Sequence, residues 1–225
     1  MAKLDSISTA VEDYAKAIYA LQSAAGGPIT NNALAERLGV TPASASAMVK
    51  KLDGLGLVEH VPYRGVELTA AGRRVALEVL RHHRLLELYL AESLGVPWDR
   101  VHAEAEVLEH HISEELEELI AQKLGNPTHD PHGDPIPTRE LELVESASAT
   151  LDSLATGARG RFTRISDHDP EMLRYLADRG IAPGDHFEVM DKQPFGGPLF
   201  VRFGDELHVV GGRLAAAMRV EEARA

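Results

Sequence analysis

Residues 102–119 (HAEAEVLEHHISEELEEL) carry carboxylates and imidazoles at a density that could bind a cation. If this segment is a helix turning by about 100° per residue, four side chains share one stripe between apolar positions: His102, Glu106, Glu109 and His110. Carboxylates at the edge of an apolar face need a positive partner, because burying an unpaired charge costs several kcal/mol. The other acids fall in another sector, where we expect a solvated face: Glu104, Glu114, Glu115 and Glu118.

A divalent metal ion is the partner that this pattern favours, because the neighbouring helical segments contain few Lys or Arg residues. The preceding segment adds His83 and Glu87 at i and i+4, and the following loop adds Asp130 and His132. Acids and imidazoles without thiols suit Mn²⁺, Fe²⁺, Co²⁺ or Zn²⁺, and the excess of oxygen donors favours the harder ions. The alternative is a helix edge with exposed acids and incidental histidines.

The composition is that of a globular chain of 225 residues, with 44% hydrophobic and 26% charged residues. The absence of cysteine excludes disulfides, thiolate catalysis and zinc-finger sites. No run approaches the roughly 18 apolar residues of a membrane span, and MAKLDSISTA lacks the apolar segment of a signal peptide. We therefore expect a cytoplasmic protein with no membrane partner.

The net charge of −12 is distributed unevenly. Residues 1–75 hold 8 Lys/Arg against 7 Asp/Glu, whereas residues 76–145 hold 5 against 16, together with 7 of the 11 histidines. The acidity thus lies in the His-rich middle of the chain, and the N-terminal third can approach an anion.

The N-terminal third has the pattern of a winged helix. An amphipathic helix over 8–25, with a capping box from Thr9 to Glu12, is followed by a short helix over 31–38 that ends at Gly39. Thr41 and Pro42 then open a second helix that runs to about residue 52. This helix-turn-helix precedes the segment LGLVEHVPYRGVELT. Apolar and polar residues alternate on both sides of a turn near residues 64–65, and this pattern predicts a β-hairpin.

The second of these helices is suited to approach DNA, because its first turns are small and hydroxylated and its end is basic. Bidentate reading of bases is not favoured, since the helix contains no Asn, Gln or Arg, so shape or thymine-methyl contacts would carry the specificity. The candidate DNA-contacting residues are Thr41, Pro42, Ala43, Ser44, Ser46, Lys50, Lys51 and, on the wing, Arg64.

The rest of the chain predicts two long helices, over 70–94 and 98–124, then a Pro- and Gly-rich loop and a helical or linker-like stretch over 140–157. Short strands and one helix over 170–179 indicate a small β-barrel. The expected class is α+β, mostly α. The expected boundaries are a winged helix over 1–75, a helical metal-binding and dimerisation domain over 76–145, a linker over 146–157 and a barrel over 158–225.

Several of these segments together resemble the diphtheria-toxin-repressor (DtxR/IdeR) family of metal-dependent transcription regulators, nearer its manganese-responsive (MntR-like) branch in the three-domain form. The similarity rests on VEDYAKAIY, LGVTPASASAMVKKLDGLGLVEHVPYRGVELTAAGR, RHHRLLELYL, VHAEAEVLEHHIS, LGNPTHDPHGDPIP and RISDHDPEMLRYLADRGI. It implies an SH3-like (FeoA-like) barrel and a primary metal site formed by Asp13, Glu106, Glu109 and His110.

The resemblance also bears on the metal and on a second site. Iron-responsive relatives carry Met and Cys where this chain has Asp13 and Glu106, so the exchange favours Mn²⁺. Compact manganese regulators build a two-metal site with a Glu at the position of Lys16, and the lysine disfavours a closely bridged pair here. The implied ancillary ligands are either His83, Glu87 and His102, or Glu87, Asp130 and His132, with Asp167 preferred over Asp169 as the ligand from the barrel.

We therefore expect a repressor that binds a double-stranded DNA operator as a homodimer when Mn²⁺ is plentiful, without enzymatic activity or a small-molecule substrate. An iron-dependent regulator of the same family is the alternative. A carboxylate-bridged di-metal oxidoreductase is less favoured, because such sites use Glu-x-x-His on two helices and this chain has no second matching helix. A metal-independent winged-helix regulator is the third possibility.

Overall fold

The chain folds into two compact units that are interleaved in sequence. The structure is a computed structural model and describes residues 7–61, 63–144, 148–166 and 169–223. Unit 1 contains the chain up to His83 together with Leu108–Ile112 and Pro137–Leu143, and unit 2 contains Arg84–Val107, Ser113–Ile136 and the chain from Val144 onward. The border between the units crosses a continuous helix, and the expected domain boundaries stay predictions.

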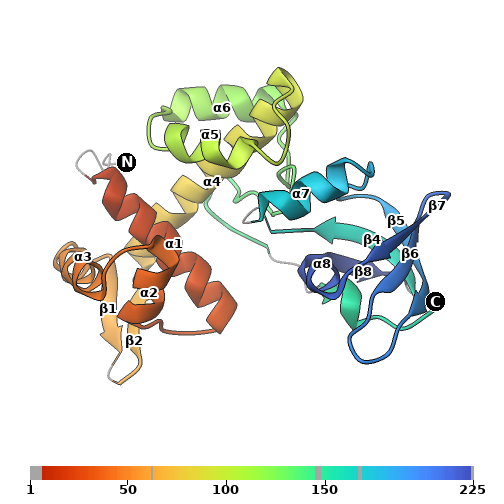
Figure 1. Ribbon diagram of the computed structural model, residues 1–225. Coiled ribbons are helices and arrows are strands. Elements are labelled where there is room, and N and C mark those ends of the chain that lie inside the picture. Colours follow the sequence, from red (N-terminus) through yellow and green to blue (C-terminus); the bar gives the residue numbers. More distant parts are fainter. Residues whose placement is uncertain (1–6, 62, 145–147, 167–168, 224–225) are drawn as a thin grey trace. The chain divides into compact units, whose positions relative to one another are not determined.

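Unit 1 contains the predicted winged helix (Figure 1). The side chain of Thr30 accepts a hydrogen bond from the Ala33 N–H at the start of the second helix, and Gly39 ends it with a left-handed φ of 64°. Thr41 caps the third helix by accepting from the Ser44 N–H. Both predicted boundaries of the helix-turn-helix are therefore confirmed. The elements are α1 (Thr9–Ala25), α2 (Asn31–Leu38), α3 (Pro42–Gly54), β1 (Val58–Val61), β2 (Gly65–Leu68) and α4 (Ala70–Leu94).

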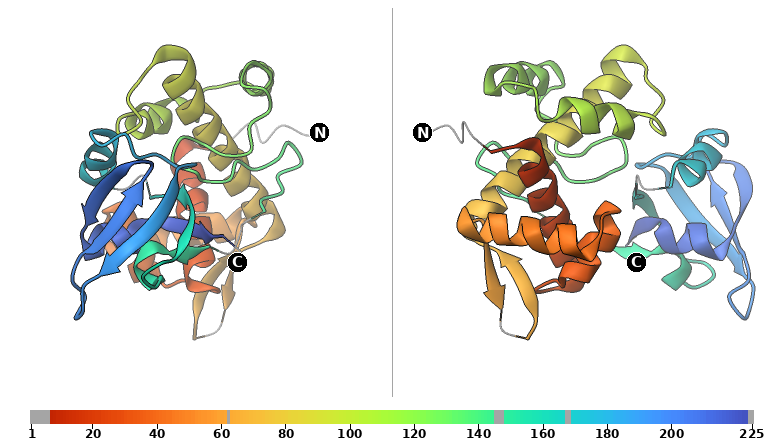
Figure 2. Two further views of the ribbon diagram at one scale, coloured as in Figure 1. Left: turned by 90° about the vertical axis from the view of Figure 1, so that its right-hand side faces the viewer. Right: turned by 60° about the vertical axis from the view of Figure 1, so that its left-hand side comes forward.

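The predicted hairpin is also confirmed, with β1 and β2 paired antiparallel from Val58↔Leu68 to Val61↔Gly65. It lies next to α3 in unit 1 (Figure 2). Gly65 has a φ of 118°, and a Cβ there would lie 1.9 Å from the carbonyl oxygen of Ile29. The base of the wing is therefore packed directly on the connection between α1 and α2, and only glycine fits.

The capping box expected at the start of α1 is wrong. Ser8 is the N-cap residue, it makes no side-chain capping bond, and Thr9 already belongs to the helix. Glu12 does not fold back to the helix start, because its carboxylate contacts the imidazole of His110 instead. The tertiary contact between Glu12 and His110 therefore forms in place of the local capping box.

The long helix expected over 98–124 is also wrong, because it is broken into α5 (Val101–Leu108) and α6 (Glu114–Lys123). Residues 109–111 form a turn, and Ser113 caps α6 by accepting from the Leu116 N–H. In an unbroken helix the carbonyl of Glu109 would bond to residue 113, but here the ring of His82 contacts that oxygen at 3.0 Å. The helical stripe predicted for His102, Glu106, Glu109 and His110 therefore holds only for the first two residues, because α5 ends at Leu108.

Unit 2 contains a six-stranded antiparallel sheet in the order β3-β8-β4-β5-β6-β7. It confirms the small SH3-like sheet domain and the α+β class. Apolar side chains such as Phe162, Val189 and Val201 form its core. The elements are β3 (Ala149–Thr150), η1 (Leu151–Ser153), β4 (Arg159–Arg164), α7 (Pro170–Ala177), β5 (His186–Lys192), β6 (Leu199–Phe203), β7 (Glu206–Val210), α8 (Gly212–Ala217) and β8 (Arg219–Glu222).

No α-helix forms in the described part of residues 140–157, where the only helical element is the single 3-10 turn η1. Thr150 pairs with Arg219 in the sheet, and Leu151 and Leu154 are buried in its core. Sheet pairing and burial have overridden local helix propensity. Across the described ranges, no helix has both the length and the apolar character needed to cross a bilayer.

Candidate functional site

The first cluster of candidate ligands lies in unit 1 and joins α1 to the turn that follows α5. Ligand atoms of Asp13, Glu109 and His110 all lie within 4.8 Å of one another. His110 Nε2 is 2.8 Å from Asp13 Oδ1 and 3.4 Å from Glu109 Oε1. Burial raises the pKa of Asp13, although the charge and hydrogen bond of His110 act to lower it.

The ring of His110 is oriented by Glu12, which sequence reasoning had assigned to a helix cap. His110 Nδ1 lies 2.6 Å from Glu12 Oε2, and the imidazole is 7% exposed. A carboxylate at Nδ1 holds the proton on that nitrogen and leaves Nε2 to face Asp13 and Glu109. This carboxylate–histidine arrangement is the one that supports histidine ligands in metal sites.

Glu109 is the buried centre of the cluster, with a side chain that is 0% exposed. Lys16 Nζ donates to both carboxylate oxygens, at 2.7 and 2.9 Å. His83 Nδ1 contacts Oε2 at 2.5 Å. Burial alone would raise the pKa of Glu109, but the hydrogen bond from His83 and the charge of Lys16 outweigh it and hold the pKa below its usual value.

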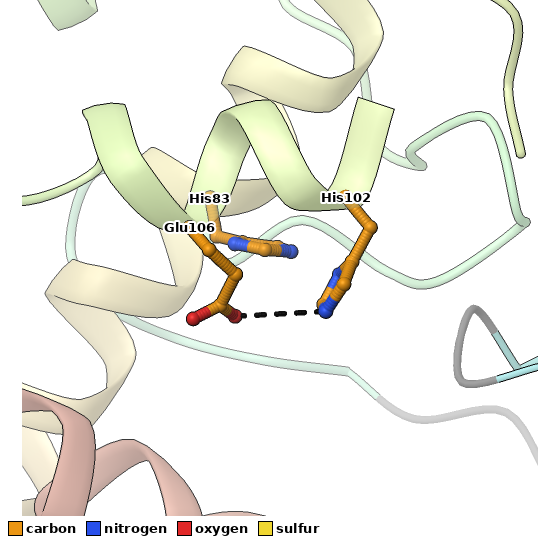
Figure 3. A group of neighbouring side chains, drawn as sticks. All are labelled: His83, His102 and Glu106. Carbon is orange, nitrogen blue, oxygen red and sulfur yellow. Dashed lines mark ion pairs between the residues drawn. The ribbon is translucent and has the colours of Figure 1, made fainter. Parts of the chain in front are cut away.

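Two carboxylates and one imidazole form a donor set that suits Mn²⁺, Fe²⁺ or Zn²⁺. The fourth predicted ligand, Glu106, belongs to unit 2. There His102 and Glu106 project from the same side of α5, and His102 Nε2 lies 3.8 Å from Glu106 Oε1 (Figure 3). His83, which is drawn in the same figure, is part of unit 1. A ligand role for Glu106 stays a prediction.

A second cluster lies in unit 2 and is completely buried. Ligand atoms of Glu87 on α4 and of Asp130 and His132 in the following loop lie within 4.8 Å of one another. His132 Nε2 lies 2.8 Å from the carbonyl oxygen of Trp98, and the two rings stack with centroids 5.7 Å apart. Because a carbonyl only accepts, Nε2 carries the proton and Nδ1 is turned toward Glu87.

The contact between His132 and Glu87 tests whether a cation fits this cluster. His132 Nδ1 lies 3.7 Å from Glu87 Oε2, beyond hydrogen-bond length, and it has no hydrogen-bond partner among the residues that the structure describes. Two ligands bonded to one ion at about 2.1 Å lie roughly 3–3.6 Å apart when the angle between them is about 90–120°. The donor types therefore suit a shared cation, and the 3.7 Å spacing lies just above this range.

The electrostatics of the second cluster also call for positive charge. Burial acts to lower the pKa of His132, but interaction with the nearby Glu87 carboxylate and the charge of Asp130 raise it to about 9. Burial, followed by the charges of Asp134 and Glu87, raises the pKa of Asp130. Arg84, whose Nε lies 3.8 Å from Asp130 Oδ2, supplies part of the positive charge that these buried carboxylates need, and a proton or a metal ion would supply the rest.

The loop that carries this cluster is fixed to the sheet of unit 2. Asp130 Oδ1 accepts from the N–H groups of His132 and Asp134, and Asp134 pairs with Arg84 at 3.2 Å and Arg164 at 2.5 Å. The Ile165 N–H donates to the carbonyl of His132 at 2.9 Å. The loop therefore reaches strand β4 through backbone as well as charge contacts.

Of the two proposed sets of ancillary ligands, one is brought together in unit 2, whereas the other is divided between the two units. Glu87, Asp130 and His132 lie together, and His102 Nδ1 lies 3.3 Å from the other oxygen of Glu87. His83 contacts Glu109 in the first cluster. Asp167, the preferred ligand from the barrel, lies outside the described residues.

The candidate DNA-contacting residues share the exposed face of α3 and the wing. Ala45, Val49 and Leu52 point into the core, so the opposite side of the helix faces solvent. Asn31 donates to Ser46 Oγ at 3.0 Å and ties α2 to this helix. The exposed candidates are Thr41, Pro42, Ala43, Ser44, Ser46, Lys50, Lys51 and Arg64.

Comparison with known proteins places all these features in one family. Residues 6–66 match the N-terminal DNA binding domain of the iron dependent repressors, residues 69–138 match their metal binding and dimerisation domain, and residues 149–222 match the FeoA domain. The iron-dependent repressor IdeR of Mycobacterium leprae (strain TN) is 31% identical over 231 residues, which cover 97% of this chain and 100% of that protein.

Solved structures agree with this assignment. A manganese-dependent transcriptional repressor in complex with manganese is 40% identical and has a TM-score of 0.86, covering 95% of this chain and 100% of its own. The manganese regulator SloR is 31% identical, with a TM-score of 0.75 over 95% of this chain and 98% of its own. The chain therefore belongs to the iron-dependent repressor family, whose members include the diphtheria toxin repressor.

Proposed function

We propose that this chain is a metal-dependent transcriptional repressor that binds double-stranded operator DNA as a homodimer when Mn²⁺ occupies the first cluster. The observation that carries the proposal is the convergence of Asp13, Glu109 and His110. A bound divalent cation supplies the positive charge that this donor set accommodates. Because DNA is the proposed partner, we place the action of the protein in the cytoplasm.

The residues of the cluster link metal binding to DNA binding through α1. Asp13 lies on α1, which packs against α2 and α3, whereas Glu109 and His110 lie in the turn after α5. Holding Asp13 to that turn fixes α1 and, with it, the helix that carries the DNA-contacting residues. Metal would then act by stabilising the conformation that binds the two half-sites of the operator.

Manganese is favoured over iron by the donor atoms of the first cluster, which are oxygen and imidazole nitrogen. The similarity to manganese-dependent repressors supports the same choice. The match to a metal binding and dimerisation domain supports the homodimer. Fe²⁺ is the alternative effector, and Zn²⁺ and Co²⁺ are further ions that the same donors can accept.

The test is the Mn²⁺ dependence of DNA binding in Asp13→Ala, measured by fluorescence anisotropy with an operator selected from random duplex DNA. We expect wild-type protein to bind only with Mn²⁺, and Asp13→Ala to lose this response while its circular dichroism is unchanged. Glu104→Ala, which removes an exposed acid of α5, is the matched control and should respond like wild type. Wild-type Mn²⁺ dependence in Asp13→Ala would contradict the proposal.

A further inference from the structure

Lys16 lies inside the first cluster, where its ammonium already pairs with the central carboxylate. Lys16 Nζ is 2.7 and 2.9 Å from the two oxygens of Glu109 and 3.5 Å from His83 Nδ1. The side chain of Lys16 is 18% exposed, whereas that of Glu109 is 0% exposed. Lys16 is on α1, one turn beyond Asp13, so the same helix supplies both a ligand and a positive charge.

The ammonium has a clear role in the metal-free protein. An ionised carboxylate without a partner at this depth would strongly destabilise the fold. Lys16 and His83 provide that compensation and hold the pKa of Glu109 low, so the carboxylate stays ionised. The central carboxylate is thus compensated without a metal ion.

The same contact opposes a divalent cation. Both oxygens of Glu109 are engaged by Lys16, and a second cation beside this carboxylate would be repelled by the ammonium at short range in a weakly screened site. A lysine has a flexible four-carbon stem, and Lys16 reaches the cluster from a partly exposed position. Its ammonium can therefore leave Glu109 for solvent without a rearrangement of α1.

We propose that Lys16 is an affinity-determining residue, a tethered cation that competes with the metal ion for Glu109 and so sets the metal concentration at which the first cluster loads. This inference rests on the proposed function, because it takes Glu109 as a metal ligand. It assigns Lys16 two effects of opposite sign: it stabilises the metal-free protein and it weakens metal binding.

The first experiment measures Mn²⁺ affinity by isothermal titration of the full chain for wild type, Lys16→Met and Lys16→Arg. Lys16→Met keeps a similar volume without the charge, and we expect its Kd to fall about tenfold or more, because a short-range repulsion between cations is removed. Its melting temperature without metal should fall as well. Lys16→Arg should bind like wild type, and so should Lys123→Met, which removes an exposed lysine of α6.

The outcomes separate this inference from the proposed function. An absence of Mn²⁺ binding by wild type would contradict the proposed function. Normal binding by wild type with equal or weaker binding by Lys16→Met would overturn the inference alone, because Lys16 would then hold Glu109 in place for the metal. Binding by Lys16→Arg as tight as that of Lys16→Met would also overturn it.

A second experiment uses wild-type protein and does not depend on the folding of a variant. Acetylation of lysines by a water-soluble reagent is followed by mass spectrometry with and without Mn²⁺. We expect Mn²⁺ to raise the reactivity of Lys16 several-fold relative to Lys123, because the ammonium leaves Glu109 for solvent. Unchanged or lower reactivity of Lys16 in the presence of Mn²⁺ would refute the competition.

Discussion

At the scale of single residues, the first cluster consists of candidate ligands and of further side chains that hold those ligands in place. Glu12 contacts His110 at Nδ1, and His83 contacts Glu109 at Oε2. Neither interaction could be read from helical periodicity, because each joins α1 or α4 to a turn far away in sequence. Asp13 itself emerged only from the resemblance to a known family, since an acid in the first turn of a helix usually serves the helix dipole.

The first prediction concerns Glu12→Gln, which keeps the size of the side chain but removes the charge that holds the Nδ1 proton of His110. We expect Mn²⁺ affinity to fall about 10- to 100-fold, the range found when an outer-shell carboxylate is replaced. Isothermal titration measures this directly, with Glu36→Gln on the exposed side of α2 as the control. A Glu12→Gln protein that binds Mn²⁺ as wild type does would show that Glu12 does not orient the ring.

At the scale of elements, caps and turns predicted most of unit 1, whereas tertiary contacts determined what the pattern missed. As expected, Gly39 ends α2, Thr41 caps the start of α3, and the residues around Gly65 form the turn of the hairpin. The break after α5 was missed because His82 binds a backbone carbonyl that a continuous helix would use. His82 is far from Glu109 in sequence, so a pattern read over neighbouring residues does not include it. The helix predicted from periodicity was therefore too long.

The loop that carries the second cluster depends on a glycine where it packs on β4. Gly133 has a φ of 84°, and a Cβ there would lie 1.9 Å from the carbonyl oxygen of Thr163. Gly125 has a similar φ of 76° but open space around it. A substitution at Gly125 would therefore introduce backbone strain alone, whereas one at Gly133 would introduce backbone strain and steric overlap.

The second prediction compares Gly133→Ala with Gly125→Ala by urea unfolding. The positive φ should lower the free energy of unfolding in both by roughly 1–2 kcal/mol. Gly133→Ala should be destabilised by about 1–3 kcal/mol more, because its methyl group displaces the loop from β4. Equal destabilisation of the two variants would mean that the loop moves freely and that its packing on β4 does not stabilise unit 2.

The third prediction concerns the basic end of α3 and uses the salt dependence of DNA binding. Lys50→Ala and Lys51→Ala should each weaken operator binding in the presence of Mn²⁺, for any sequence. The slope of log K against log salt is negative, and each variant should make it less steep by about 0.9 for every phosphate that the lysine neutralises. Lys123→Ala, on the exposed side of α6, should leave the slope unchanged. An unchanged slope for both α3 variants would place the DNA elsewhere.

At the scale of the whole molecule, the two clusters belong to different compact units. The first joins α1 to the turn after α5 and contacts His83 in the middle of α4, and α1 packs against α2 and α3. The second is fixed to the sheet of unit 2 through Asp134, Arg164 and the backbone of His132. On the proposed function, this division predicts separate roles, in which the first cluster controls DNA binding and the second stabilises unit 2.

The fourth prediction follows from that separation and concerns Asp13→Ala and His132→Phe, each of which removes a candidate ligand from one cluster. Equilibrium dialysis should find one Mn²⁺ fewer per chain in each variant, because the clusters share no ligand. Mn²⁺ at about 100 times its Kd stabilises a folded protein by about 2.7 kcal/mol per site, so chelation should lower the melting temperature less in each variant than in wild type. His132→Phe should keep its Mn²⁺-dependent operator binding, whereas Asp13→Ala should lose it. Loss of operator binding in both would show that the second cluster also controls the DNA-reading helices, and that the two units act as one switch.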